Sequence, residues 1–238
     1  MSEILPVAKR LSVVKPSATV AVSQRANELK AQGVDVLSFS VGEPDFNTPE
    51  HIGQAAKDAI AAGHTRYTAA RGILELRQAI CERSAKRRGG VAHDPSEVVV
   101  SVGAKHTLFN LALALYDEGD EVIIPAPYWV SYPEQVRIVG ASPVIVDTDA
   151  ASGFRMTPEA LSAAITPKTK ALVLCSPSNP TGSAYTAEQL RALADVAAKH
   201  KFWLIVDEIY GELVYEGFEQ KSVLEVAPEL KDRIIIVD

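Results

Sequence analysis

The sequence lacks the features that mark secreted and membrane-spanning proteins. Only two cysteines, Cys81 and Cys175, occur among 238 residues, and they form no C-x-x-C pair. So few thiols in a chain of this length indicate a reducing compartment, and we expect a cytoplasmic protein. No apolar run approaches the roughly 18 residues that a membrane-spanning helix needs, so we predict no membrane contact.

The chain also lacks the signals of several ligand classes. Its 24 basic and 30 acidic residues give a net charge of −6, and no basic run stands out, which argues against nucleic acid as a partner. The five histidines are scattered and no H-E-x-x-H occurs, so no metal site is predicted. The G-x-G-x-x-G fingerprint is absent, which disfavours a nucleotide-binding dehydrogenase.

What the chain does contain is a regular alternation of elements. Apolar runs predict strands at residues 36–41, 97–102, 121–124, 143–147, 170–175, 202–206 and 233–238. Helical spacing predicts helices at 16–32, from Thr48-Pro49 to Gly63, at 73–88, 104–116 and 129–139, and after Thr157 and Thr186. Strands alternating with amphipathic helices imply an α/β fold, with a mostly parallel sheet and helices on both faces.

The most informative stretch is Phe-Trp-Leu-Ile-Val-Asp-Glu-Ile-Tyr at 202–210. Five apolar residues suit a strand buried on both faces, and Asp207 follows directly at its end. Open α/β sheets bind ligands at the carboxyl ends of their strands, so Asp207 is a candidate ligand contact. The alternative is that Asp207 caps a following helix.

Other strand ends also carry polar or aromatic groups. Gly103 and the small residue after it open a helix, where backbone N–H groups can approach an anion. Trp129 can stack on a flat ligand, and the turn at 176–182 aims the amide of Asn179. Tyr210 lies one helical turn from Asp207. Each feature alone also suits an ordinary turn or core position, but together they suit a planar phosphorylated heterocycle.

Four motifs carry a resemblance to a known family: Val-Gly-Glu-Pro-Asp at 41–45, Pro-Tyr-Trp-Val at 127–130, Asn-Pro-Thr-Gly at 179–182 and Val-Asp-Glu-Ile-Tyr at 206–210. In this order they resemble the class I, fold-type I aminotransferases that use pyridoxal 5'-phosphate, and the bacterial aspartate and aspartate/prephenate enzymes above all. The resemblance implies a cofactor-binding large domain at 46–238, incomplete at its C-terminus. Residues 1–45 would form an N-terminal arm and part of a small domain.

The resemblance also implies roles in holding the cofactor. Asp207 would pair with the pyridine nitrogen and keep it protonated, which makes the ring an electron sink. Asn179 and Tyr210 would hydrogen-bond the phenolic oxygen of the ring, and Trp129 would stack on it. Asp207 and Tyr210 are therefore the predicted catalytic residues.

Further roles concern the phosphate, the substrate and a second subunit. The predicted phosphate site comprises Gly103, Ala104 and Lys105, with Tyr67 reaching the phosphate of a partner subunit in a homodimer with shared active sites. The predicted contacts of the substrate's α-carboxylate are Gly42, Trp129 and Asn179. Lys105, with Lys15 nearby, would bind the distal carboxylate of the substrate, since an ammonium suits a carboxylate. The alternative is that Lys105 is simply solvated.

The implied reaction is transamination of aspartate or glutamate with 2-oxoglutarate or oxaloacetate, so the partners are amino-acid and 2-oxo-acid substrates. The family's Schiff-base lysine and its two anion-binding arginines have no counterpart within the 238 residues. We therefore expect the front part of a longer protein, inactive by itself, because transamination needs that lysine as covalent anchor and base. The alternatives are a prephenate or aromatic aminotransferase, another fold-type I enzyme such as a β-lyase, or a non-catalytic binding module.

Overall fold

The computed structural model describes residues 5, 7–39, 42–44 and 46–238. The chain divides into two units, one of residues 16–73 and one of residues 74–238 together with the N-terminal segment up to Lys15. The larger unit carries the whole sheet and most of the predicted site.

The smaller unit contains two helices, α1 (Ala18–Ala31) and α2 (Glu50–Ala61). Ser17 caps α1, because its hydroxyl accepts a hydrogen bond from the N–H of Val20 at 3.4 Å. The helix predicted from Thr48-Pro49 begins later, after Pro49, and neither the Thr48 hydroxyl nor any other side chain caps α2.

The predicted strand at 36–41 is not confirmed. Residues 36–39 have no regular structure, and residues 40–41 lie outside the described part of the chain. Leu37 and Phe39 are 84% and 96% exposed, so no neighbouring layer buries their side chains. An apolar run becomes a strand only where another strand completes its hydrogen-bond ladder.

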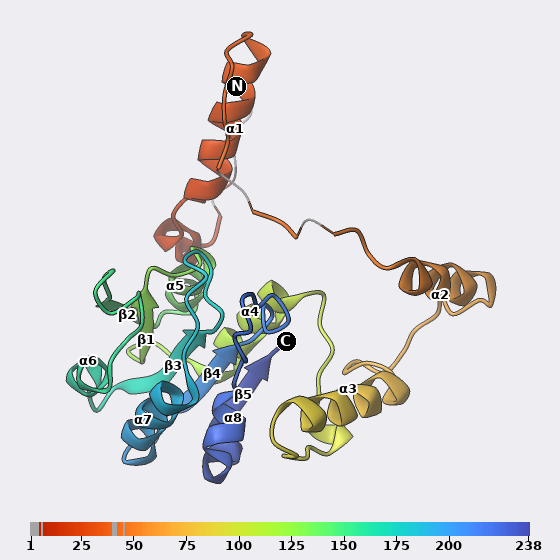
Figure 1. Cartoon of the computed structure of the whole chain (residues 1–238). Coiled ribbons are helices and arrows are strands. Elements are labelled where there is room, and N and C mark those ends of the chain that lie inside the picture. Colours follow the sequence, from red (N-terminus) through yellow and green to blue (C-terminus); the bar gives the residue numbers. More distant parts are fainter. Residues whose placement is uncertain (1–4, 6, 40–41, 45) are drawn as a thin grey trace. The chain divides into compact units, whose positions relative to one another are not determined.

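The larger unit is built on a five-stranded sheet, and its strands are β1 (Glu121–Ala126), β2 (Ser142–Asp147), β3 (Thr169–Cys175), β4 (Trp203–Asp207) and β5 (Ile234–Val237). They lie in the order β2-β1-β3-β4-β5, and every neighbouring pair is parallel. This confirms the predicted α/β class and five of the predicted strands (Figure 1).

Helices cover both faces of the sheet, as predicted: α4 (Ala104–Leu115), α5 (Ser131–Ile138), α6 (Pro158–Ala164), α7 (Ala187–Ala198) and α8 (Val223–Val226). The helix α3 (Leu74–Arg87) has no buried residue and belongs to neither core. Short 3-10 helices are η1 (Lys9–Val13), η2 (Pro95–Glu97) and η3 (Pro228–Arg233). One core joins α4 and α5 to the sheet, and the other joins α6, α7 and α8 to the opposite face. Successive strand side chains alternate between the faces, so Ile205 enters the first core and Leu204 and Val206 the second.

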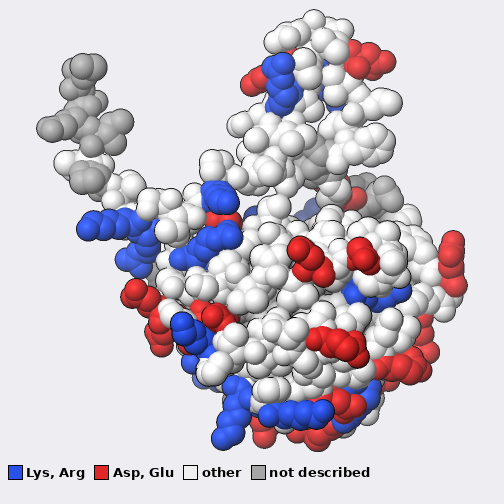
Figure 2. All heavy atoms as spheres, turned by 90° about the vertical axis from the view of Figure 1, so that its left-hand side faces the viewer, with Lys and Arg blue, Asp and Glu red and all other residues white. Residues whose placement is uncertain are grey.

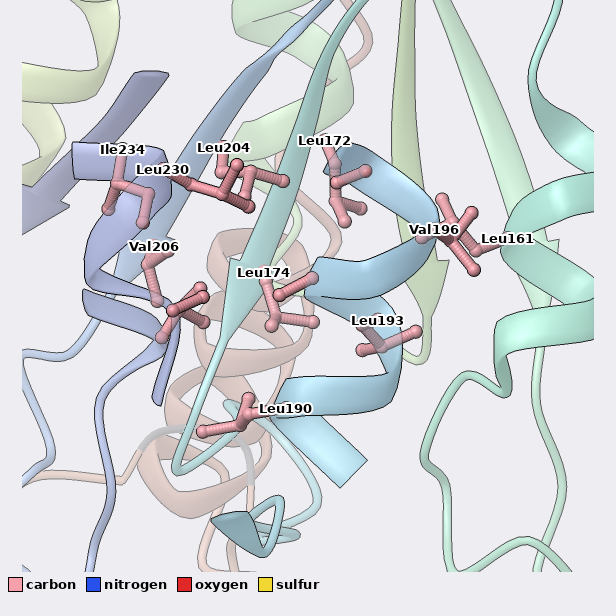
Figure 3. Close-up of a cluster of buried hydrophobic side chains, with 14 of the residues drawn as sticks. Leu161, Leu172, Leu174, Leu190, Leu193, Val196, Leu204, Val206, Leu230 and Ile234 are labelled. Carbon is pink, nitrogen blue, oxygen red and sulfur yellow. The ribbon is translucent and has the colours of Figure 1, made fainter. Parts of the chain in front are cut away.

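The second core is packed mainly with aliphatic side chains. Figure 3 shows Leu172 and Leu174 of β3 facing Leu190 and Leu193 of α7. Leu172 and Leu190 are each 1% exposed, and burying such a side chain contributes about 2 kcal/mol. The helix predicted after Thr186 is α7, and it begins at a capping box. The hydroxyl of Thr186 accepts from the N–H of Gln189 at 3.3 Å, and the N–H of Thr186 donates to the side-chain oxygen of Gln189 at 3.0 Å.

The predicted strand at 97–102 was wrong. Its first residue ends η2, a short helix that Asp94 caps through a hydrogen bond from the N–H of Ser96 at 2.8 Å. The residues that follow form no ladder, and Val99 and Val102 are 64% and 87% exposed. No strand in the part of the chain that the structure describes lies beside this segment to hydrogen-bond with it.

The surface of the larger unit carries both signs of charge. On the face in Figure 2, lysine and arginine side chains are intermixed with aspartates and glutamates. Within the described residues, no helix is long and apolar enough to cross a membrane. Over the same residues, no group of three or more His, Cys, Asp or Glu side chains converges as a metal site would require.

Candidate active site

The site lies where the order of the strands reverses. The chain leaves β1 for β2 on one side, and then crosses back to β3 on the other side of β1 before continuing to β4. In open α/β sheets ligands bind in the crevice outside the carboxyl ends of the strands at such a point. Trp129 follows β1, Asn179 follows β3 and Asp207 ends β4, so the topology brings all three to one edge.

The carboxylate of Asp207 is buried and has no cationic partner in the part of the chain that the structure describes. Its side chain is 2% exposed, and it accepts hydrogen bonds from the hydroxyl of Tyr132 at 2.6 Å and from the N–H of Ile209 at 3.4 Å. Burial raises the pKa of Asp207, and these two hydrogen bonds offset that rise only in part. None of the ion pairs among the described residues includes Asp207. A buried carboxylate in this state suits a ligand that brings a positive charge or a polar hydrogen.

The alternative role for Asp207, as the cap of a following helix, was wrong. Residues 209–212 form turns, and the next α-helix, α8, begins only at Val223 under its own cap, Ser222. The backbone N–H that Asp207 accepts therefore belongs to a turn. The carboxylate remains available at the end of the strand.

The side chains of Asn179 and Tyr210 contact each other, and both residues follow strands of the sheet, β3 and β4. The turn that carries Asn179 is closed by a hydrogen bond from the N–H of Gly182 to the carbonyl of Ser178 at 2.8 Å. The amide nitrogen of Asn179 donates to the hydroxyl of Tyr210 at 3.4 Å, and both side chains are partly buried. Two neutral hydrogen-bonding groups from different loops thus converge, as they must to share one ligand oxygen.

The N-terminus of α4 has the properties of an anion site. Gly103 is its N-cap with a φ of 79°, a conformation that glycine adopts without strain, and no side chain caps the helix. The first N–H groups of a helix have no acceptor within it, and the helix dipole favours negative charge there. Ala104 and Lys105 form the first turn, as the predicted phosphate site requires.

The two predicted substrate lysines both contact α5. The ammonium of Lys105 lies 5.0 Å from the ring centroid of Trp129, within the range of a cation–π interaction, and its carbonyl accepts from Gln135 at 3.0 Å. The backbone N–H of Lys15 donates to the carboxylate of Glu134 at 2.9 Å. Glu134 and Gln135, which are consecutive in α5, therefore hydrogen-bond to the backbone of Lys15 and Lys105, respectively.

Gly42 and Tyr67 belong to the smaller unit. Both residues are exposed there, and Tyr67 is fully so. Their predicted contacts with substrate and with a partner subunit's phosphate stay predictions.

Sequence reasoning missed a buried ion pair next to Asp207. Arg88 and Glu208 are each 3% exposed, and the Nε of Arg88 donates to Oε2 of Glu208 at 2.9 Å. Arg88 also pairs with Asp238 at 2.8 Å and donates to Ser84 at 3.1 Å, so it joins the end of α3 to the ends of β4 and β5. The available signal was the pair of carboxylates at 207–208, since adjacent strand residues face opposite sides of a sheet.

The comparisons with known proteins agree with this geometry. The family model for "Aminotransferase class I and II" matches residues 34–238, and the chain belongs to that family. The chain is 50% identical to the aspartate aminotransferase of Geobacillus stearothermophilus, over 98% of this chain and 59% of that protein. It is 52% identical to the aspartate/prephenate aminotransferase of Thermus thermophilus, over 94% of this chain and 57% of the relative.

Solved structures show the same fold. The crystal structure of the aspartate aminotransferase from Rhizobium meliloti matches with a TM-score of 0.93 and 45% identity, over 97% of this chain and 57% of that one. The Thermus thermophilus aspartate aminotransferase with maleate matches with a TM-score of 0.89 and 49% identity, over 98% of this chain and 60% of that one. The chain thus spans about three fifths of the length of these relatives.

Proposed function

We propose that the full-length protein is a pyridoxal-phosphate-dependent aminotransferase. Its substrates would be aspartate or glutamate, with 2-oxoglutarate or oxaloacetate as the amino acceptor. The observation that carries this proposal is the buried carboxylate of Asp207, which ends β4 and has no cation paired with it among the described residues. The names of the relatives in Geobacillus and Thermus support aspartate as the amino donor.

The residues present fit this cofactor. A protonated pyridine nitrogen would supply the positive charge that Asp207 lacks, and each charge would favour the other. Asn179 and Tyr210 would hold the phenolic oxygen, and Trp129 would cover the ring. Gly103, Ala104 and Lys105 would hold the phosphate at the start of α4. When bound, the cofactor supplies an electron-withdrawing ring that stabilises negative charge on the α-carbon of the substrate.

Other residues would bind the substrate and a second subunit. Gly42, Trp129 and Asn179 would orient the α-carboxylate, and Lys105 with Lys15 would bind the distal one. Tyr67 would reach the phosphate site of the partner in a homodimer. In this proposal residues 46–238 belong to the cofactor-binding domain, and residues 1–45 form an arm and part of a small domain.

Cofactor binding and turnover test the proposal. We expect the full-length polypeptide to bind pyridoxal 5'-phosphate with a new visible absorbance band, and to consume aspartate in the presence of 2-oxoglutarate. Asp207→Ala should abolish turnover, because the ring nitrogen loses the partner that holds its proton. A full-length protein that binds no cofactor, or an Asp207→Ala variant with unchanged turnover, would contradict the proposal.

Residues 1–238 expressed alone should show no transamination. The resemblance requires a lysine that bonds the cofactor covalently and moves the α-proton, and that lysine has no counterpart within residues 1–238. Turnover by this segment alone would refute the assignment of that role.

Prephenate is the second candidate acceptor. The aspartate/prephenate aminotransferase of Thermus thermophilus supports it. Direct assay of prephenate in place of 2-oxoglutarate as the amino acceptor separates the candidates. Lys105→Ala tests recognition of the distal carboxylate, because loss of an ammonium there should affect aspartate much more than an aromatic amino acid. Equal losses on both amino acids would remove Lys105 from substrate recognition.

A further inference from the structure

Tyr132 joins the predicted ring-stacking residue to the predicted ring-nitrogen partner. Its ring packs edge-on against Trp129, with centroids 5.3 Å apart and an interplanar angle of 83°. Its hydroxyl donates to Oδ2 of Asp207 at 2.6 Å. Tyr132 is itself 4% exposed, so this short contact lies out of water.

Two different elements fix the ends of this contact. Tyr132 is in the first turn of α5 and packs into the same core as Ile205 of β4, whereas Asp207 ends β4. Neither side chain can turn away without leaving a buried polar group unpaired, which is costly. The tyrosine therefore restricts the orientation of the carboxylate as well as hydrogen-bonding it.

We propose that Tyr132 is a positioning residue, whose hydroxyl fixes the orientation of the Asp207 carboxylate and favours its ionised form, so that Asp207 is ready to accept the proton-bearing nitrogen of the cofactor. This inference rests on the proposed function. It assigns Tyr132 no contact with substrate or cofactor. It gives the tyrosine hydroxyl a role beyond filling the core, since a phenylalanine would fill nearly the same volume.

The other groups facing Asp207 do not replace this hydroxyl. Cys175 of β3 is the register partner of Asp207, but its thiol donates to the carbonyl of Pro177 at 3.3 Å. Asp238, after β5, repels the Asp207 carboxylate and raises its pKa. The N–H of Ile209 is the other donor, at the longer distance of 3.4 Å. Loss of the Tyr132 hydroxyl would leave only this weak donor to oppose burial.

The test compares Tyr132→Phe with Tyr116→Phe in the full-length polypeptide. Tyr116 is a matched control, because it is 6% exposed and packs in the same core, and its hydroxyl is not among the groups that act on the Asp207 carboxylate. One readout is the affinity for pyridoxal 5'-phosphate, measured by fluorescence titration. A second is the ¹³C NMR titration of the Asp207 carboxyl in cofactor-free protein, assigned with Asp207→Asn.

We expect Tyr132→Phe to weaken cofactor binding about tenfold, as the loss of one charge-assisted hydrogen bond does. It should also raise the pKa of Asp207 in the cofactor-free protein, because the ionised carboxylate loses its best donor. Tyr116→Phe should change neither value.

The two proposals fail in different ways. Wild-type protein that binds no pyridoxal 5'-phosphate refutes the proposed function, whatever the tyrosine variants do. The role of Tyr132 alone is refuted by a different result. In that result the wild-type protein binds the cofactor and Asp207→Ala abolishes binding, but Tyr132→Phe and Tyr116→Phe behave equally in both readouts.

Discussion

Replacement of Arg88 by methionine tests the energetics of the buried ion pair beside the site. Methionine keeps much of the length and apolar volume of the arginine stem but carries no charge. Glu208 would then remain 3% exposed, with its Oε1 already lacking a hydrogen-bond partner and its Oε2 losing Arg88. Removing one partner of such a pair leaves an uncompensated buried charge.

The expected cost follows from which charges stay buried. Breaking a buried pair by removing one partner costs about 3–5 kcal/mol of the free energy of unfolding. Asp238, the second partner of Arg88, adds little to this cost. Its side chain is 35% exposed, and it retains an ion pair with Arg87 at 2.9 Å. Glu208 therefore accounts for most of the loss.

The loss should depend on pH in a defined direction. Burial raises the pKa of Glu208, and the nearby charge of Arg88 counteracts that rise. Without Arg88 the pKa rises further, so the folded variant binds a proton more readily than the unfolded chain does. The destabilisation is then greatest above the folded-state pKa and shrinks as the pH falls through it, because a neutral Glu208 needs no counter-charge.

Urea unfolding of the full-length polypeptide, followed by circular dichroism at neutral pH and at about pH 5, measures this effect. Adding Glu208→Leu to Arg88→Met should recover most of the loss, since buried pairs can be replaced by apolar residues at little cost. Arg25→Met is the matched control: Arg25 pairs with Glu28 on the surface, 65% and 61% exposed, and the change should cost less than about 1 kcal/mol. A loss independent of pH and not recovered in the double variant would refute the reasoning.

Three further predictions concern the core, a helix cap and a thiol. Leu172→Ala should lower the free energy of unfolding by about 3–5 kcal/mol, because the side chain is 1% exposed between β3 and α7, and urea titration measures this. Thr186→Ala should cost about 1 kcal/mol by losing half of the capping box of α7, with Thr186→Ser as the control that keeps the hydroxyl. Burial raises the pKa of the Cys175 thiol to about 11, so at pH 8 only about one thiol in a thousand is ionised, and it should react with a thiol reagent far more slowly than a free cysteine does. Labelling at the same rate as free cysteine would show that the thiol is accessible and ionises normally.

The local patterns predicted most of the sheet but not the contacts that assemble its edge. The runs predicted as strands at 121–124 and 202–206 became β1 (Glu121–Ala126) and β4 (Trp203–Asp207), because a buried strand between helix layers needs little beyond continuous hydrophobicity. The run predicted as a strand at 97–102 is also mostly apolar, but a pattern along one chain cannot reveal whether a neighbouring strand lies alongside it. Turn and strand-end chemistry placed Asn179 and Asp207 at the carboxyl ends of β3 and β4, where the structure has them, and their roles stay predictions.

The sequence could not predict which side chains hydrogen-bond to Asp207 and which to Glu208. Arg88 lies 120 residues from Glu208 in the chain, and no periodicity connects them. Tyr132 lies two residues beyond the motif at 127–130, and only the packing of α5 against the end of β4 shows that its hydroxyl reaches Asp207.

The side chains of Asp207 and Glu208 at the end of β4 point to opposite sides of the sheet, and this limits the insertions and deletions that the strand can tolerate. Asp207 faces the tyrosine of α5 on one side of the sheet, and Glu208 faces the arginine after α3. Deletion of one residue within β4 would shift the following residues by one position. Glu208 would then face Tyr132 in place of Asp207, and Ile209 would face Arg88 in place of Glu208. Insertions and deletions fixed during evolution should therefore accumulate in the loop at 211–221 and be absent from 203–208, even where individual substitutions in that strand are accepted.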